Sequence, residues 1–133
     1  MLFRSTQSQL NYNSVAYLSL DTGYPNARDR ANGSTGSALM IHGGCSSAGC
    51  FAIEDRPMQD LFATVRDSLK AGQREIQLHI FPFKMNSWNM AAHVNNPNYN
   101  FWLQLKRGYD LFTWDRQDLD IVVANGRYVY VAR

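Results

Sequence analysis

The residues best suited to chemistry lie in one short segment, residues 41–51, which reads Ile-His-Gly-Gly-Cys-Ser-Ser-Ala-Gly-Cys-Phe. A free cysteine has a pKa of about 8.5, so only a few per cent of it is nucleophilic thiolate at neutral pH unless a base lies beside it. His42 precedes Cys50 by eight positions, with three glycines between them. Because glycine allows tight turns, the pattern predicts that Cys50 is a nucleophile and that His42 is its base.

The glycines of this segment also favour an oxyanion hole. Gly43 and Gly44 can form a tight turn directly after His42. Gly49 lets backbone N–H groups near Cys50 point into a cleft, because it has no Cβ in the way. Such donors stabilise the charge that develops when a thiolate attacks a carbonyl. The segment is typical of covalent acyl chemistry, which needs no cofactor.

With these residues in place, the segment resembles the YkuD-type L,D-transpeptidases of bacterial cell walls, whose signature is a His-Gly followed by Ser/Thr-x-Gly-Cys. The matching residues here are His42-Gly43 and Ser47-Ala48-Gly49-Cys50. The short His-to-Cys loop is closer to the YafK-like branch, and residues 23–30, 79–83 and 101–110 extend the resemblance over nearly the whole chain. The commoner motif has a second histidine where this chain has Ala48, so the role of that histidine does not carry over.

The resemblance implies an α+β fold, a β-rich YkuD-like sandwich or barrel with flanking helices, in a single catalytic domain over residues 1–133. Domains of this branch normally begin with several strands upstream of the part that matches from Leu10 onward. Only nine residues precede Leu10, so we expect these N-terminal strands to be missing. An open sheet edge left in their place would favour dimerisation, because its N–H and C=O groups are unpaired.

The implied substrate is the stem peptide of peptidoglycan, attacked by Cys50 at an amide around meso-diaminopimelate to give an acyl-enzyme. An amine acceptor makes the enzyme a transpeptidase that forms cross-links or attaches a lipoprotein. If water is the acceptor, the enzyme is an amidase or peptidase. The residue types do not distinguish a transpeptidase from such a hydrolase. Two other functions are compatible with the same motifs. The chain could be a catalytically silent module that binds peptidoglycan, or a secreted toxin aimed at rival cell walls. The resemblance places the protein in the periplasm or outside the cell, although the N terminus carries no signal peptide.

Other side chains have less specific interpretations. Cys45 lies in the loop away from the motif position, so packing or an accessory cleft contact is favoured over a disulfide to Cys50. A zinc site built on His42, Cys45 and Cys50 lacks a paired Cys-x-x-Cys spacing and a fourth ligand. Arg30 either supports a turn with Asp29 or binds a substrate carboxylate, which suits the planar guanidinium.

Composition and the distribution of charged and apolar residues limit the class of protein in which this site lies. The chain has 133 residues, of which 45% are hydrophobic and 18% charged, enough for one domain with a real core. The net charge of +2 is small and scattered, which excludes a nucleic-acid footprint, and no apolar run is long enough for a membrane span. His79 falls on the polar side of a strand, and His93 lies in an irregular polar stretch.

The elements that must position the site follow from hydrophobic periodicity. Alternation and short apolar runs predict strands at 15–20, 38–41 and 75–81, and an Asn-Gly turn predicts a hairpin over 121–131. A single apolar face predicts a helix from Asp55 to Gly72, and a second helix is expected from about Pro97 to Gly108. Residues 23–36 are expected to form only turns or loop.

Overall fold

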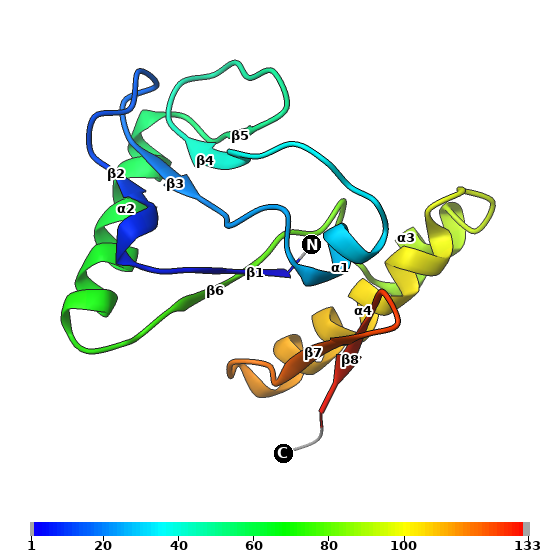
Figure 1. The fold of residues 1–133 in the computed structure, drawn as a ribbon. Helices are drawn as coiled ribbons and strands as arrows, with labels where there is room; N and C mark the ends of the chain where they lie inside the picture. The colour runs from blue at the N-terminus through cyan, green and yellow to red at the C-terminus, as the bar shows by residue number, and fades with distance from the viewer. Residues whose placement is uncertain (1, 132–133) are drawn as a thin grey trace. The chain divides into compact units, whose positions relative to one another are not determined.

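A computed structural model of the protein describes residues 2–131 and contains both helices and strands along the chain (Figure 1). In chain order the elements are β1 (Leu2–Ser5), the 3-10 turn η1 (Gln7–Gln9), β2 (Leu10–Asn11), β3 (Ser19–Asp21), α1 (Ala27–Ala31), β4 (Met40–His42), β5 (Phe51–Ala52), α2 (Asp55–Lys70), β6 (Ile76–His79), α3 (Ser87–Ala92), α4 (Tyr99–Asp115), β7 (Ile121–Ala124) and β8 (Arg127–Tyr130). The α+β class is therefore confirmed. The described strands form three separate sheets, none of which closes into a barrel.

The chain divides into two compact units. One consists of Leu2–Asn26 and Ser34–Leu78, and the other of Ala27–Gly33 and residues 79–131. The first unit contains the whole segment from His42 to Cys50 and is called the loop unit below. The second contains the two C-terminal helices and the hairpin and is called the hairpin unit. That residues 1–133 act as a single domain stays a prediction.

A four-stranded sheet in the order β2-β3-β4-β5 is the scaffold of the loop unit. The pairs β2–β3 and β3–β4 are antiparallel, whereas β4 and β5 run parallel. Helix α2 contacts β3 and β4. Its buried side chains recur on one face: Met58, Phe62, Val65 and Leu69. Burial of each such side chain contributes roughly 1.5–3 kcal/mol, so this face fixes α2 against the sheet, and the predicted helix is confirmed.

In the hairpin unit, the predicted Asn-Gly turn is confirmed. Asn125 and Gly126 have φ values of +50° and +69°, and the flanking strands β7 and β8 pair antiparallel. Two positive φ values in succession match the twist of a two-residue hairpin. Helix α4 packs against β8, and Gly108 is buried there.

Three sequence expectations need correction. Residues 27–31 were expected in a loop but form α1. The guanidinium of Arg28 lies 3.6 Å from the centroid of the Phe101 ring, and tertiary contacts of this kind stabilise a helix too short to persist alone. Helix α4 continues seven residues beyond Gly108, because this glycine makes room for a packed ring and does not act as a cap. The strand expected at 15–20 is shorter and begins only at Ser19.

None of the helices between residues 2 and 131 is long and apolar enough to cross a membrane.

Candidate active site

The two ends of the predicted motif are brought together by neighbouring strands. His42 is the last residue of β4, and Cys50 directly precedes β5. In the parallel register His42 lies opposite Ala52. Cys50 lies outside the strand, two positions before Ala52, at the end of the loop that returns from His42. Neighbouring strands lie about 5 Å apart, so the pairing of β4 with β5 brings the two ends of the loop close together.

The imidazole of His42 is hydrogen-bonded to the backbone of the next residue, Gly43. Its Nδ1 atom lies 2.5 Å from the carbonyl oxygen of Gly43. A carbonyl oxygen can only accept, so Nδ1 carries the hydrogen of this bond. In the neutral ring the proton-accepting nitrogen is then Nε2. His42 is half-buried, and this bond defines which nitrogen of its ring can accept a hydrogen.

The thiol of Cys50 is half-buried and donates a weak hydrogen bond to the carbonyl oxygen of Ala38, with a sulfur-to-oxygen distance of 3.6 Å. This contact ties the thiol to the segment just before β4. Ala38 itself has a φ of +57°, a left-handed conformation that non-glycine residues rarely adopt. Cys45 is exposed, and both cysteines are free thiols, so the disulfide alternative is not formed.

Gly43 is required by close packing. A Cβ at this position would lie 2.6 Å from Oδ1 of Asp55 and 2.8 Å from the carbonyl oxygen of Ala16. Both distances are shorter than non-bonded atoms tolerate, so no larger residue fits without a shift of the backbone. Gly44 and Gly49 have φ values of +74° and +106°, in the region that favours glycine. Glycine is therefore required in this loop for two reasons: close packing at Gly43 and a positive φ at Gly44 and Gly49.

Hydrogen bonds anchor the loop of residues 43–50 at its base. The N–H of Gly43 donates to the carbonyl of Leu18 at 3.1 Å, and the N–H of Glu54 donates to the carbonyl of Gly44 at 2.9 Å. Oδ1 of Asp55 accepts from the N–H of Gly44 at 2.7 Å. Asp55 was missed by sequence reasoning as a site residue, because its position at the start of a helix explains it without any role in the loop.

The tip of the loop is open to solvent. Residues 45–49, including Ser47 and Ala48, are all exposed. Arg30 is exposed on α1, in the hairpin unit. Its neighbour Asp29 is 2% exposed and pairs with Arg28 at 3.9 Å. Among residues 2–131, no group of three His, Cys, Asp or Glu side chains could hold a metal ion.

The other two histidines pack against aromatic rings of the hairpin unit. The ring of His79 lies 5.2 Å from that of Phe112, edge to face. His93 ends α3 and lies 4.6 Å from the Phe83 ring and 5.7 Å from the Trp102 ring. The sequence suggested no contact for His93, and in the structure its ring packs against two aromatic rings.

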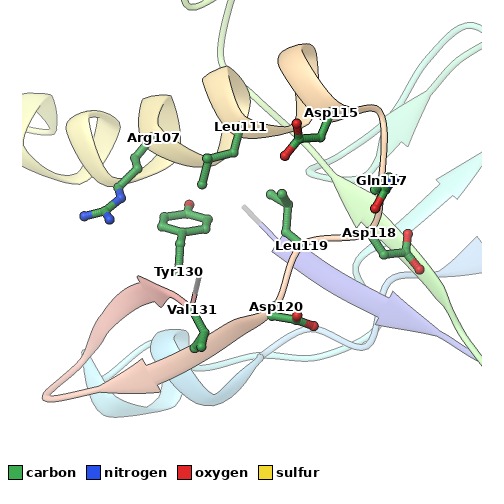
Figure 2. Close-up of a pocket in the computed structure, with 9 residues that line it drawn as sticks. All are labelled: Arg107, Leu111, Asp115, Gln117, Asp118, Leu119, Asp120, Tyr130 and Val131. Atoms are coloured by element: carbon green, nitrogen blue, oxygen red, sulfur yellow. The ribbon is translucent and has the colours of Figure 1, made fainter. Parts of the chain in front are cut away.

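The hairpin unit also contains a cavity of about 300 Å³ between α4 and the end of β8. Figure 2 shows its apolar centre, formed by Leu111, Leu119 and Tyr130, with the carboxylate of Asp115 above it. None of the predicted site residues lines this cavity.

Comparison with known proteins agrees with the motif. No model of a protein family matches the sequence. The protein named "Putative L,D-transpeptidase YafK" of Escherichia coli (strain K12) is 43% identical over 128 residues, which is 96% of this chain. This chain belongs to the YafK-like L,D-transpeptidases. The protein of the same name from Escherichia coli O157:H7 matches to the same extent. This YafK-like chain spans about half, 52%, of the length of either relative.

Proposed function

We propose that the protein catalyses cysteine-dependent acyl transfer on the stem peptides of peptidoglycan. The observation that carries the proposal is the parallel pairing of β4 with β5, because it brings Cys50, directly before β5, next to the strand that ends at His42. The similarity to proteins named as L,D-transpeptidases supports the choice of substrate. A substrate in the cell wall requires that the protein act in the periplasm or outside the cell.

The reaction begins with proton transfer. Nε2 of His42 takes the proton of the Cys50 thiol, and the bond from Nδ1 to the Gly43 carbonyl stabilises the imidazolium that forms. The thiolate then attacks the amide carbonyl of the donor peptide. As the C–N bond breaks, His42 returns the proton to the leaving amine, and a thioester joins the peptide to Cys50. An acceptor amine attacks the thioester, forms the new amide and releases the Cys50 thiol.

The oxyanion that forms during attack needs backbone donors. The N–H of Gly43 is used by Leu18 and that of Gly44 by Asp55, so neither of them serves this purpose. We therefore assign the oxyanion donors to the Gly49–Cys50 end of the loop. Gly49 has nothing within 4 Å of its missing Cβ, which leaves room for a substrate carbonyl beside the thiol.

Acylation by a carbapenem tests the proposal, because this strained cyclic amide traps a nucleophilic thiol as a stable adduct. The native protein and the control Cys45→Ala should each gain the mass of one drug molecule. Cys50→Ala should gain none. His42→Ala should gain it more slowly, by about 10²- to 10⁴-fold, because some thiolate forms without a base. A native protein that stays unmodified while Cys50 is free would instead favour a peptidoglycan-binding module.

Incubation with purified muropeptides identifies the acceptor. Cross-linked products, read by mass spectrometry, indicate amine acceptors, whereas shortened products indicate water and hence an amidase or peptidase. A wall-linked lipoprotein as partner and a dimer through a sheet edge stay predictions. Gel filtration of the purified protein tests the second of these.

Arg30 is proposed as a binding residue for a substrate carboxylate. Lysine keeps the charge but loses the planar, two-pronged geometry of the guanidinium. Arg30→Lys should therefore raise KM for muropeptides about tenfold and leave the melting temperature unchanged, since Arg30 is exposed. A large fall in melting temperature would show that Arg30 supports the fold.

A further inference from the structure

Tyr17 has a backbone conformation that its own side chain opposes. Its φ is +73°, in the left-handed region where a bulky residue clashes with its own backbone. Neighbouring hydrogen bonds hold the segment in place. The N–H of Ala16 donates to Oγ of Ser14 at 3.2 Å, and the carbonyl of Leu18 accepts from Gly43 at 3.1 Å. Residues kept in such conformations gather at functional sites, and here the residues on both sides of Tyr17 are hydrogen-bonded.

The segment around Tyr17 lies against the turn that follows His42. A Cβ at Gly43 would be 3.0 Å from Cβ of Tyr17. The carbonyl of the same glycine orients the His42 imidazole. Two residues after Tyr17, Ser19 pairs directly with His42 in the antiparallel register of β3 and β4. The side chain of Tyr17 therefore starts at the edge of the candidate site and within the same unit.

The side chain itself is not used to build the core. Tyr17 is 45% exposed, and a glycine would adopt the same backbone conformation without strain. The backbone thus gives no reason for an aromatic residue at this position. A half-exposed phenol offers a flat apolar face and a hydroxyl that can donate or accept a hydrogen bond. An extended peptide, with flat amide groups that both donate and accept, is the ligand that fits both features.

We propose that Tyr17 is a substrate-positioning residue, whose ring forms one wall of the peptide-binding surface beside His42 and whose hydroxyl bonds the peptide backbone. The inference rests on the proposed function for the identity of the peptide. It does not require that Cys50 complete a reaction. The strained conformation of Tyr17 is then retained because the ring must lie next to the imidazole. A glycine at this position would favour stability, whereas the tyrosine favours binding.

Peptide binding to a catalytically inactive protein separates this inference from the proposed function. In a Cys50→Ala background, Tyr17→Gly should raise the Kd for a stem-peptide muropeptide at least tenfold, measured by calorimetry, while the melting temperature stays the same or rises. Tyr17→Phe should weaken binding by less, since the ring remains. The control Arg116→Gly relieves a similar φ of +56° in the hairpin unit and should leave the Kd unchanged.

Several results would overturn the inference. The Cys50→Ala protein could bind no muropeptide, or could bind it equally well with Tyr17→Gly. A fall in melting temperature together with slower iodoacetamide labelling of Cys50 in the single variant Tyr17→Gly would mark Tyr17 as structural. Failure of the proposed function would show in a different experiment, in which the native protein neither turns over muropeptides nor is acylated by a carbapenem.

Discussion

The carboxylate of Asp55 accepts a hydrogen bond from the backbone N–H of Gly44 at 2.7 Å. Asp55 is the first residue of α2, so its charge is also favoured by the positive end of the helix dipole. One side chain thus links the helix that packs on the sheet to the turn that follows His42. The position of that turn depends on the helix and not on the loop sequence alone.

Removal of this link should slow acylation. Asp55→Ala leaves the N–H of Gly44 without its acceptor and lets the turn shift, and small shifts of catalytic groups cost about 10- to 100-fold in rate. Asp55→Asn keeps an acceptor oxygen at the same place and should stay within a few-fold of the native rate. The rate of carbapenem adduct formation measures both. A native rate in Asp55→Ala would mean that the loop needs no such support.

Alkylation should distinguish the two cysteines. Cys45 is exposed whereas Cys50 is half-buried, so access alone would favour Cys45. If His42 activates the thiol as proposed, iodoacetamide near pH 6.5 should label Cys50 first, because ordinary thiols are almost wholly protonated there. Peptide mapping identifies the labelled residue. Equal labelling, or faster labelling of Cys45, would contradict the assignment, and His42→Ala is the matched control that should abolish the preference.

The packing of Gly108 under Tyr130 gives a stability prediction. A Cβ at Gly108 would lie 2.6 Å from the Tyr130 hydroxyl oxygen and 2.7 Å from a ring carbon. Although alanine is the better helix former, Gly108→Ala should lower the free energy of unfolding by about 1–3 kcal/mol through overpacking. In a Tyr130→Val background the same change should cost little, since the clash is gone. Urea denaturation of the four proteins tests whether the two residues are coupled.

Stability should fall at alkaline pH through Tyr130. Burial, followed by the nearby Tyr128, raises the pKa of Tyr130 to about 12 from the ordinary value of 10.0. Between these values the unfolded chain loses this proton while the folded chain keeps it, so ionisation favours unfolding. The contribution is complete below pH 10 and is lost progressively as the pH rises toward 12. Tyr130→Phe should show a shallower loss over this range in thermal melts, and an unchanged slope would contradict the prediction.

The sequence predicted those elements whose formation depends on residues close together in the chain. The apolar face of α2 and the Asn-Gly turn are set by residues close together in the chain, and both were placed correctly. The extent of α4 was not, since the role of Gly108 depends on Tyr130, more than twenty positions away. Helix α1 was missed because its support comes from Phe101, which no local pattern reveals.

For the candidate site, the sequence predicts the reacting residues and the structure describes their surroundings. Residue types and spacing indicate His42 and Cys50, and the pairing of β4 with β5 places these residues at the two ends of one loop. Their roles as base and nucleophile stay a prediction. The contributions of Asp55, Ala38 and Tyr17 were not foreseen. Asp55 and Ala38 contact backbone or side-chain groups of the loop, and the proposal for Tyr17 starts from its backbone conformation; the type of a side chain alone predicts neither.

Parallel strands are normally joined by a dozen or more residues, often a helix, but only residues 43–50 join β4 to β5. An exposed loop that contains glycines thus takes the place of a crossover helix. Loss or gain of one residue within β5 would shift the register and turn the side chains that follow to the opposite face. The exposed residues 45–48 are held by no such limit. Among YafK-like chains with this topology, differences in length and in residue type should therefore be confined to the tip of the loop, while the residues at its two ends stay the same.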